Sequence, residues 1–115
     1  MPSADPVGSV LKRGAESGID SLGASERTVW LISEAEVLCD MEGIDSFLAH
    51  YASLLPETAD AFAEVGATHI ADSLRAIYAQ LPTRSDELLD RANALVTART
   101  GYDYDSVARL VTEVA

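Results

Sequence analysis

The stretch from Glu26 to Leu81 constrains the fold most, because apolar residues recur at helical spacing over most of its length. Leu31, Ala35 and Leu38 follow one another at positions i, i+4 and i+7, which places them on one stripe of a helix. No alternation of apolar and polar residues is long enough to predict a strand. The stretch therefore favours packed helices over a sheet.

Glycines and prolines divide this pattern into helices. Gly43 and Gly66 are expected to be structural turns, because glycine adopts backbone conformations that other residues avoid. Pro56 opens one helix and Pro82 ends another. The sequence predicts a single all-α domain over residues 1–115, a compact bundle of six to seven short helices. The expected ranges are 25–41, 44–54, 56–65, 67–81, 85–99 and 104–114, after a loose N-terminus (1–5) and a weak first helix limited by Gly14 and Gly18.

The helical stripes also predict which side chains are buried. The expected core comprises Trp30, Leu31, Ala35, Leu38, Phe47, Leu48, Tyr51, Phe62, Ile70, Leu74, Ile77, Leu88, Leu95, Leu110 and Val111. Tyr78 is expected to join this core, and Trp30, Val37 and Met41 to form a second apolar stripe.

The polar residues of the helix over 25–41 indicate where it begins and which side faces solvent. Ser25 is a suitable N-cap. Ser33, Glu36 and Asp40 are expected to line the narrow solvent-facing edge of this helix. Gly101 is expected to end the helix over 85–99.

The composition excludes several classes of protein. The chain of 115 residues suits one domain, and its net charge of −11 opposes direct binding to nucleic acid or to anionic membranes. No apolar run has the length of a membrane span or a signal-peptide core. The single cysteine, Cys39, permits no intrachain disulfide, so a reducing compartment, the cytoplasm, is expected. Neither a cofactor nor a metal is implied.

Several segments of the central stretch carry a family resemblance. They are Glu26-Arg27-Thr28-Val29, then Glu36, Met41-Glu42-Gly43-Ile44 with Phe47, and the hairpin from Ala61 to Ala67 with Ala71. Over residues 26–81 they resemble an uncharacterised bacterial domain family named after the carboxy-terminal region of a DNA-mimic protein. The family's Asn-Gly-Gly-Phe is Met41-Glu42-Gly43-Ile44 here, so only the second glycine of that motif is kept. The resemblance implies an all-α fold.

Acidic residues gather in the same stretch. Residues 26–64 hold nine acidic residues and one basic residue, Arg27, and so carry most of the net charge. The nine are Glu26, Glu34, Glu36, Asp40, Glu42, Asp45, Glu57, Asp60 and Glu64. Carboxylates on exposed helix faces can imitate a row of DNA phosphates toward a basic partner such as a transcription factor. The alternative is a solvated face that only keeps the protein soluble. The leading hypothesis is a non-enzymatic, acidic protein-interaction module.

Two other classes of function stay open. A small enzyme or metal-binding protein would use Glu36, Asp40 and one of the two histidines, His50 and His69. A self-associating structural protein would use exposed apolar helix faces. The first alternative requires Glu36 and Asp40 to converge with an imidazole. If these two carboxylates are instead exposed at positions i and i+4 of a helix, they only repel each other. Cys39 is expected to be a buried thiol.

The two tyrosines near the last helix also allow two interpretations. Tyr102 and Tyr104 flank a polar turn, from which they either form a contact surface or pack the last helix against the core.

Overall fold

The computed structural model describes residues 6–112, and its regular secondary structure over that range consists of helices alone. All the expected helices are present, and the all-α single-domain prediction is confirmed. The elements are α1 (Pro6–Ser17), η1 (Ile19–Ser21), α2 (Ala24–Met41), α3 (Ile44–Tyr51), η2 (Ala52–Leu54), α4 (Leu55–Glu64), α5 (Thr68–Gln80), α6 (Asp86–Thr97) and α7 (Tyr104–Thr112). The predicted loose N-terminus, 1–5, lies outside the described residues. Across 6–112, every helix is too short or too polar to traverse a lipid bilayer.

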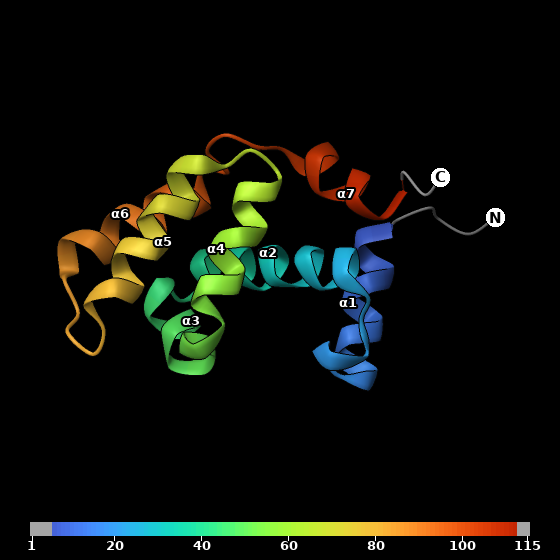
Figure 1. Cartoon of the computed structure of the whole chain (residues 1–115), viewed down its shortest axis with the longest axis horizontal. Coiled ribbons are helices and arrows are strands. Elements are labelled where there is room, and N and C mark those ends of the chain that lie inside the picture. Colours follow the sequence, from blue (N-terminus) through green and yellow to red (C-terminus); the bar gives the residue numbers. More distant parts are fainter. Residues whose placement is uncertain (1–5, 113–115) are drawn as a thin grey trace.

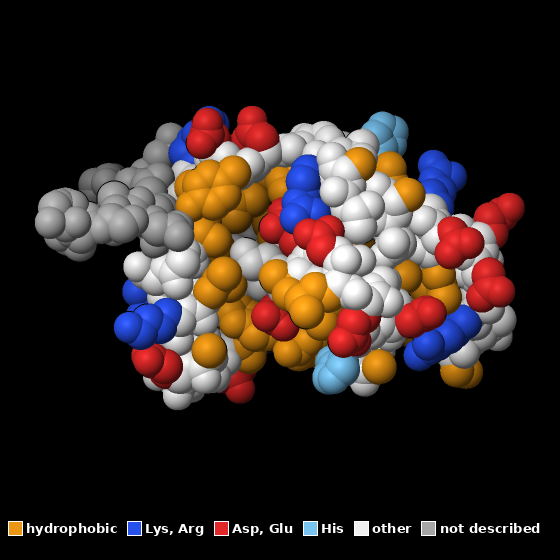
Figure 2. All heavy atoms as spheres, turned by 180° about the vertical axis from the view of Figure 1, so that it is seen from behind, with side chains coloured by type: hydrophobic (Ala, Val, Ile, Leu, Met, Phe, Trp, Pro, Cys, Tyr) orange, Lys and Arg blue, Asp and Glu red, His pale blue; other side chains and the backbone are white. Residues whose placement is uncertain are grey.

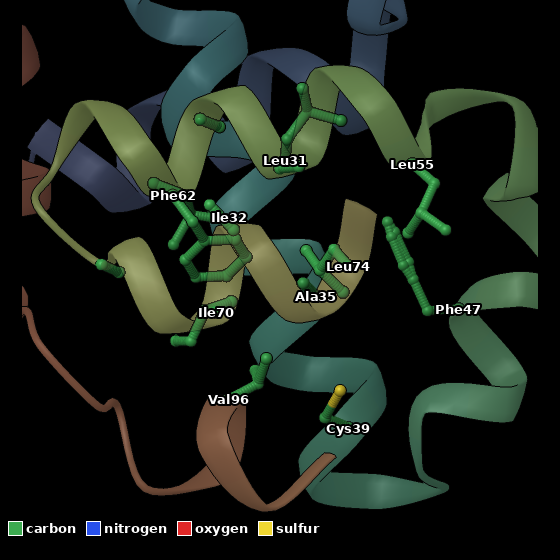
Figure 3. Packing of buried hydrophobic residues seen from close by; sticks show 14 of the residues in the cluster. Leu31, Ile32, Ala35, Cys39, Phe47, Leu55, Phe62, Ile70, Leu74 and Val96 are labelled. Atoms are coloured by element: carbon green, nitrogen blue, oxygen red, sulfur yellow. The ribbon is translucent and has the colours of Figure 1, made fainter. Parts of the chain in front are cut away.

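Helix α2 runs through the middle of the molecule and packs against α1, α3, α4, α6 and α7 (Figure 1). Its buried side includes Leu31, Ile32, Ala35 and Cys39. Figure 3 shows these side chains meeting Phe47 of α3 and residues of α4, α5 and α6. Because α2 is apolar over more than half its circumference, several helices are needed to cover it.

The α4–α5 hairpin is bent where the sequence predicts. Gly66 has a φ of +90°, and the Ala67 N–H donates to the Phe62 carbonyl at 2.9 Å. Ala67 and Ala71 are fully buried, so the two helices approach closely. Gly43 has a φ of +100° and ends α2. Both predicted structural turns therefore take conformations that favour glycine.

The core prediction is confirmed for eight of its fifteen residues and needs correction for the others. The buried ones are Leu31, Ala35, Phe47, Leu48, Phe62, Ile70, Leu74 and Ile77. Those packed on the core but only partly buried are Trp30, Leu38, Tyr51, Leu88, Leu95, Leu110 and Val111. In α6, Leu89 is buried in place of Leu88.

Three apolar side chains expected inside are exposed. Tyr78 is 47% exposed, because it lies about 100° around the helix from the buried Ile77. Val37 and Met41 are 45% and 74% exposed, because the neighbouring helices leave that side of α2 open to solvent. Conversely, Ser33, expected on the wet edge, is buried. The apolar surface of α2 is thus only partly covered.

The N-cap of α2 and the role of Gly14 both differ from the expectation. Gly23, not Ser25, is the N-cap of α2, and its N–H donates to the Glu26 carboxylate at 3.2 Å. Gly14 lies inside α1 rather than limiting it. Trp30 packs so closely on Gly14 that an added Cβ would lie 2.5 Å from the indole ring. The absent side chain at Gly14 therefore allows α1 to dock on α2.

Replacing Gly14 with Ala is expected to destabilise the protein. The methyl group displaces the Trp30 ring, and this overpacking outweighs the gain in helix propensity, for a net loss on the order of 1 kcal/mol. Urea denaturation measures the free energy of unfolding. Ser9→Ala is the control, because Ser9 is exposed on the same helix and the substitution raises helix propensity without a close contact to Trp30. A Gly14→Ala variant as stable as the wild type would contradict this packing.

Candidate functional site

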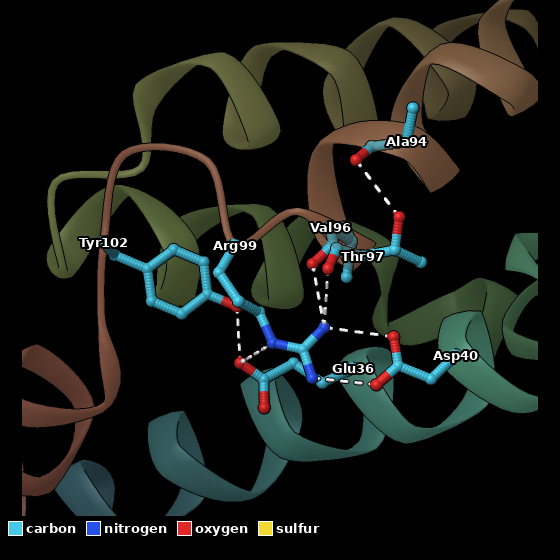
Figure 4. Close-up of polar contacts among 7 residues, drawn as sticks. All are labelled: Glu36, Asp40, Ala94, Val96, Thr97, Arg99 and Tyr102. Atoms are coloured by element: carbon cyan, nitrogen blue, oxygen red, sulfur yellow. Dashed lines mark hydrogen bonds and ion pairs between the residues drawn. The ribbon is translucent and has the colours of Figure 1, made fainter.

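Four side chains from separate parts of the chain meet in a cluster, which we call the Arg99 cluster: Glu36, Asp40, Arg99 and Tyr102 (Figure 4). The Arg99 guanidinium donates to both Asp40 oxygens, from Nη1 at 3.1 Å and from Nη2 at 2.8 Å. Its Nε lies 3.2 Å from Glu36 Oε2, which also accepts the Tyr102 hydroxyl hydrogen. The predicted repulsion between Glu36 and Asp40 is therefore wrong, because one guanidinium bridges them.

The backbone at Arg99 holds this side chain in place. Arg99 has a φ of +53°, the left-handed conformation that commonly follows a helix and favours glycine. The N–H groups of Arg99 and Thr100 donate to the Val96 and Leu95 carbonyls, which closes the end of α6. Arg99, not Gly101, therefore ends α6. The contacts of the guanidinium explain why an arginine, rather than a glycine, occupies this strained backbone conformation.

Hydrogen bonds and burial shift the pKa values of Asp40 and Tyr102 in the Arg99 cluster. The hydrogen bond from Arg99 lowers the pKa of Asp40. Burial, followed by the hydrogen bond to Glu36, raises the pKa of Tyr102, so the phenol stays neutral and acts as a donor. Tyr102 also packs edge-on against Phe62, with ring centroids 5.5 Å apart. Of the two interpretations of Tyr102, packing against the core is the one found.

The enzyme and metal alternative required an imidazole beside Glu36 and Asp40, and the structure places Arg99 and Tyr102 there instead. His50 is exposed on α3, with Nδ1 2.8 Å from the Ser46 carbonyl. His69 lies on α5 at a separate shallow cavity of about 180 Å³. Across residues 6–112, no three histidine, cysteine or acidic side chains are grouped as metal ligands. Cys39 is buried, which raises its pKa to about 12.

A groove of about 310 Å³ lies beside the Arg99 cluster, between α1, α2 and α7. Its apolar walls include Val7, Leu11, Val37 and Val107. Ser33 and the Arg99 cluster supply its polar surface. Tyr104 also lines the groove and is 56% exposed. Figure 2 shows apolar side chains gathered on this face of the molecule.

Arginines engage most of the nine candidate acidic residues. The ion pairs are Glu26 with Arg13, Glu57 with Arg27, Asp60 with Arg75, Asp45 with Arg84, and both Glu36 and Asp40 with Arg99. Glu34 instead accepts the Tyr51 hydroxyl hydrogen at 3.2 Å. Glu42 and Glu64 are exposed and form no ion pair with a basic side chain in the range 6–112. The nine carboxylates thus differ in how much charge they leave available.

A second group of carboxylates lies where α6 begins. Asp86 and Asp90 are exposed and share a helix stripe with Asn93, whose side-chain oxygen accepts the Ile44 N–H at 2.9 Å. This stripe therefore borders the turn that carries Glu42 and Asp45. We call these four residues the α3–α6 acidic edge: Glu42, Asp45, Asp86 and Asp90.

Sequence patterns did not identify Arg99, the contact of Tyr102 with Glu36, or the position of Asp86 and Asp90 beside the candidate residues Glu42 and Asp45. Arg99 lies 59 residues from Asp40, and only the packing of α6 on α2 brings the two together. The sequence signal that could have identified Arg99 is an arginine directly after a helix, at a position where glycine is usual.

Comparison with known proteins identifies a family. A family model described as DMP19-like protein matches residues 20–111, a wider range than the expected 26–81. No curated protein matches this chain. No solved structure matches it either.

Replacing Arg99 with Met is expected to destabilise the protein in a pH-dependent way. The variant leaves Glu36 and Asp40 without their shared cation, at a cost on the order of 1 kcal/mol at pH 7, since the cluster is partly exposed. The folded-state pKa of Asp40 is lowered, so this contribution is present above the unfolded pKa of about 4 and is lost as the pH falls through the folded pKa. The difference in the free energy of unfolding between the variant and the wild type should therefore be smaller at pH 3 than at pH 7.

Urea denaturation at pH 7 and pH 3 measures this difference in the free energy of unfolding. Arg91→Met is a matched control, because Arg91 is exposed on α6 and forms no ion pair with Glu36 or Asp40. An Arg99→Met deficit that is equal at both pH values would show that Arg99 acts through packing and its hydrogen bonds to the Val96 and Thr97 carbonyls, not through the carboxylates.

Proposed function

The chain belongs to the DMP19-like protein family, and we propose that it is a non-enzymatic module that binds a basic protein through carboxylates, in the manner of a DNA mimic. The family membership is consistent with this function. The observation that carries the proposal is the negative charge that remains after the arginines have formed their ion pairs. A rigid helical scaffold holds these carboxylates at fixed separations.

The charge of the protein suits a basic partner. A net charge of −11 on 115 residues attracts a basic surface and accelerates encounter with it. DNA carries about one negative charge per 1.7 Å of duplex, so a groove built to bind DNA is lined with Lys and Arg. Carboxylates spaced along helices offer such a groove similar contacts.

The α3–α6 acidic edge is the part of the surface best suited to this contact. Three of its members, Glu42, Asp86 and Asp90, form no ion pair within the described range, and Asp45 lies 4.0 Å from Arg84. Figure 2 shows Asp and Glu side chains gathered at the end of the molecule formed by α5 and α6. By contrast, Glu36 and Asp40 are already bound by Arg99, so they contribute less to attraction. The proposal thus concerns a defined edge rather than all nine acidic residues.

Salt provides the first test. In a pull-down from the source cell, a basic DNA-binding protein is expected to be retained at about 50 mM salt and lost at about 500 mM, where charges are screened within a few ångströms. The acidic protein should then compete with duplex DNA for the partner identified in this way. A partner whose retention is independent of salt would contradict the proposed attraction by charge.

Charge reversal on the α3–α6 acidic edge provides the second test. Glu42→Lys combined with Asp90→Lys is expected to weaken binding of the isolated partner at least about tenfold, since each rim charge contributes on the order of 1 kcal/mol. The control is Glu16→Lys combined with Asp105→Lys, which makes the same change in net charge at exposed positions on α1 and α7. Calorimetry measures both affinities. Equal losses in the two variants would mean that net charge, not this edge, determines binding.

A further inference from the structure

The groove between α1, α2 and α7 combines an apolar body with an acidic end. Val7 and Val107 are buried in its walls, while Val37 is 45% exposed at its rim. The charged side chains that line it are Glu36 and Arg99. Its volume of about 310 Å³ is at the lower end of the range for small-molecule sites, which are mostly apolar with a few polar groups.

The polar groups of the groove offer acceptors rather than donors. Arg99 and Tyr102 both donate to Oε2 of Glu36, and within residues 6–112 the other oxygen, Oε1, has no partner. The Arg99 guanidinium is already occupied by Glu36, Asp40 and the Val96 and Thr97 carbonyls. With two carboxylates and one guanidinium, the cluster keeps a net negative charge. It therefore suits a ligand that donates hydrogen bonds and carries positive charge.

Ser33 adds a second polar group to the groove. It is only 6% exposed and lines the groove, but its hydroxyl is not one of the fully buried polar atoms without a partner; within the described range that is the Ser73 hydroxyl alone. The Ser33 hydroxyl is therefore open to the groove, where it can accept a hydrogen bond from a ligand.

We infer that this groove is a binding site for a small organic cation, a primary ammonium on a short apolar chain. The ammonium group donates to Glu36 Oε1 and the Ser33 hydroxyl, and the chain lies against Val7, Leu11 and Val107. Tyr104 at the rim adds an aromatic surface, which attracts cations. The inference goes beyond the proposed function, because it concerns a different surface and a different class of ligand.

Titration with n-hexylammonium, followed by ¹H–¹⁵N NMR, tests the site. Amide shifts are expected to concentrate around the groove, with a dissociation constant on the order of 1 mM for a ligand of this size. n-Hexanol and n-hexanoate have the same chain but lack the positive charge, and should bind at least about tenfold more weakly. Equal binding of all three, or shifts scattered over the acidic surface, would overturn the assignment.

Substitutions test whether hexylammonium binds in the groove. Val37→Lys places a cation at the groove rim and should abolish the hexylammonium shifts, while the exposure of Val37 allows the variant to fold. The matched control, Tyr78→Lys on α5, should bind as the wild type does. Glu36→Gln should remove the preference for hexylammonium over hexanol. Unchanged binding by Val37→Lys would overturn the proposal, as would groove shifts that appear on raising the protein concentration without amine, which would indicate a second copy.

Discussion

The apolar circumference of α2 is the constraint on which the rest of the structure depends. Leu31, Ile32 and Ala35 face different neighbours, so no single helix can bury them all. Five helices pack around α2, and each is held against it by a few side chains. Close approach requires small residues at specific places, such as Gly14 under Trp30. The core is therefore organised around one helix rather than around helix pairs of equal weight.

Charge imposes a second requirement on this arrangement. Helices rich in carboxylates repel one another when they are packed together, and the arginines relieve that repulsion where the chain folds back. Arg27 of α2 binds Glu57 at the start of α4, and Arg99 after α6 binds Asp40 of α2. Each of these contacts joins segments distant in sequence. The few basic residues thus act as cross-links, which explains how a chain of net charge −11 can be compact.

The helices could be predicted from the sequence because helical periodicity and glycine turns are local properties. Gly43 and Gly66 lie where expected, and the buried stripe of α5 is correct at Ile70, Leu74 and Ile77. Exposure of Val37 and Met41 could not be predicted, because it depends on which parts of α2 the other helices cover. The Arg99 cluster is likewise non-local. A pattern of residues shows which face of a helix is apolar, but not which neighbour covers it.

The ion pairs also decide what the acidic surface can do. A carboxylate bound by two guanidinium hydrogen bonds, as Asp40 is by Arg99, presents little field to a partner. Counting acidic residues therefore overestimates the charge available for recognition. Glu42 and Asp90 keep theirs, while Glu36, which lines the groove, keeps one oxygen without a partner in the described range. The proposed attraction of a basic protein and the proposed binding of a small cation consequently rely on different carboxylates, and a substitution in one set should leave the other unaffected.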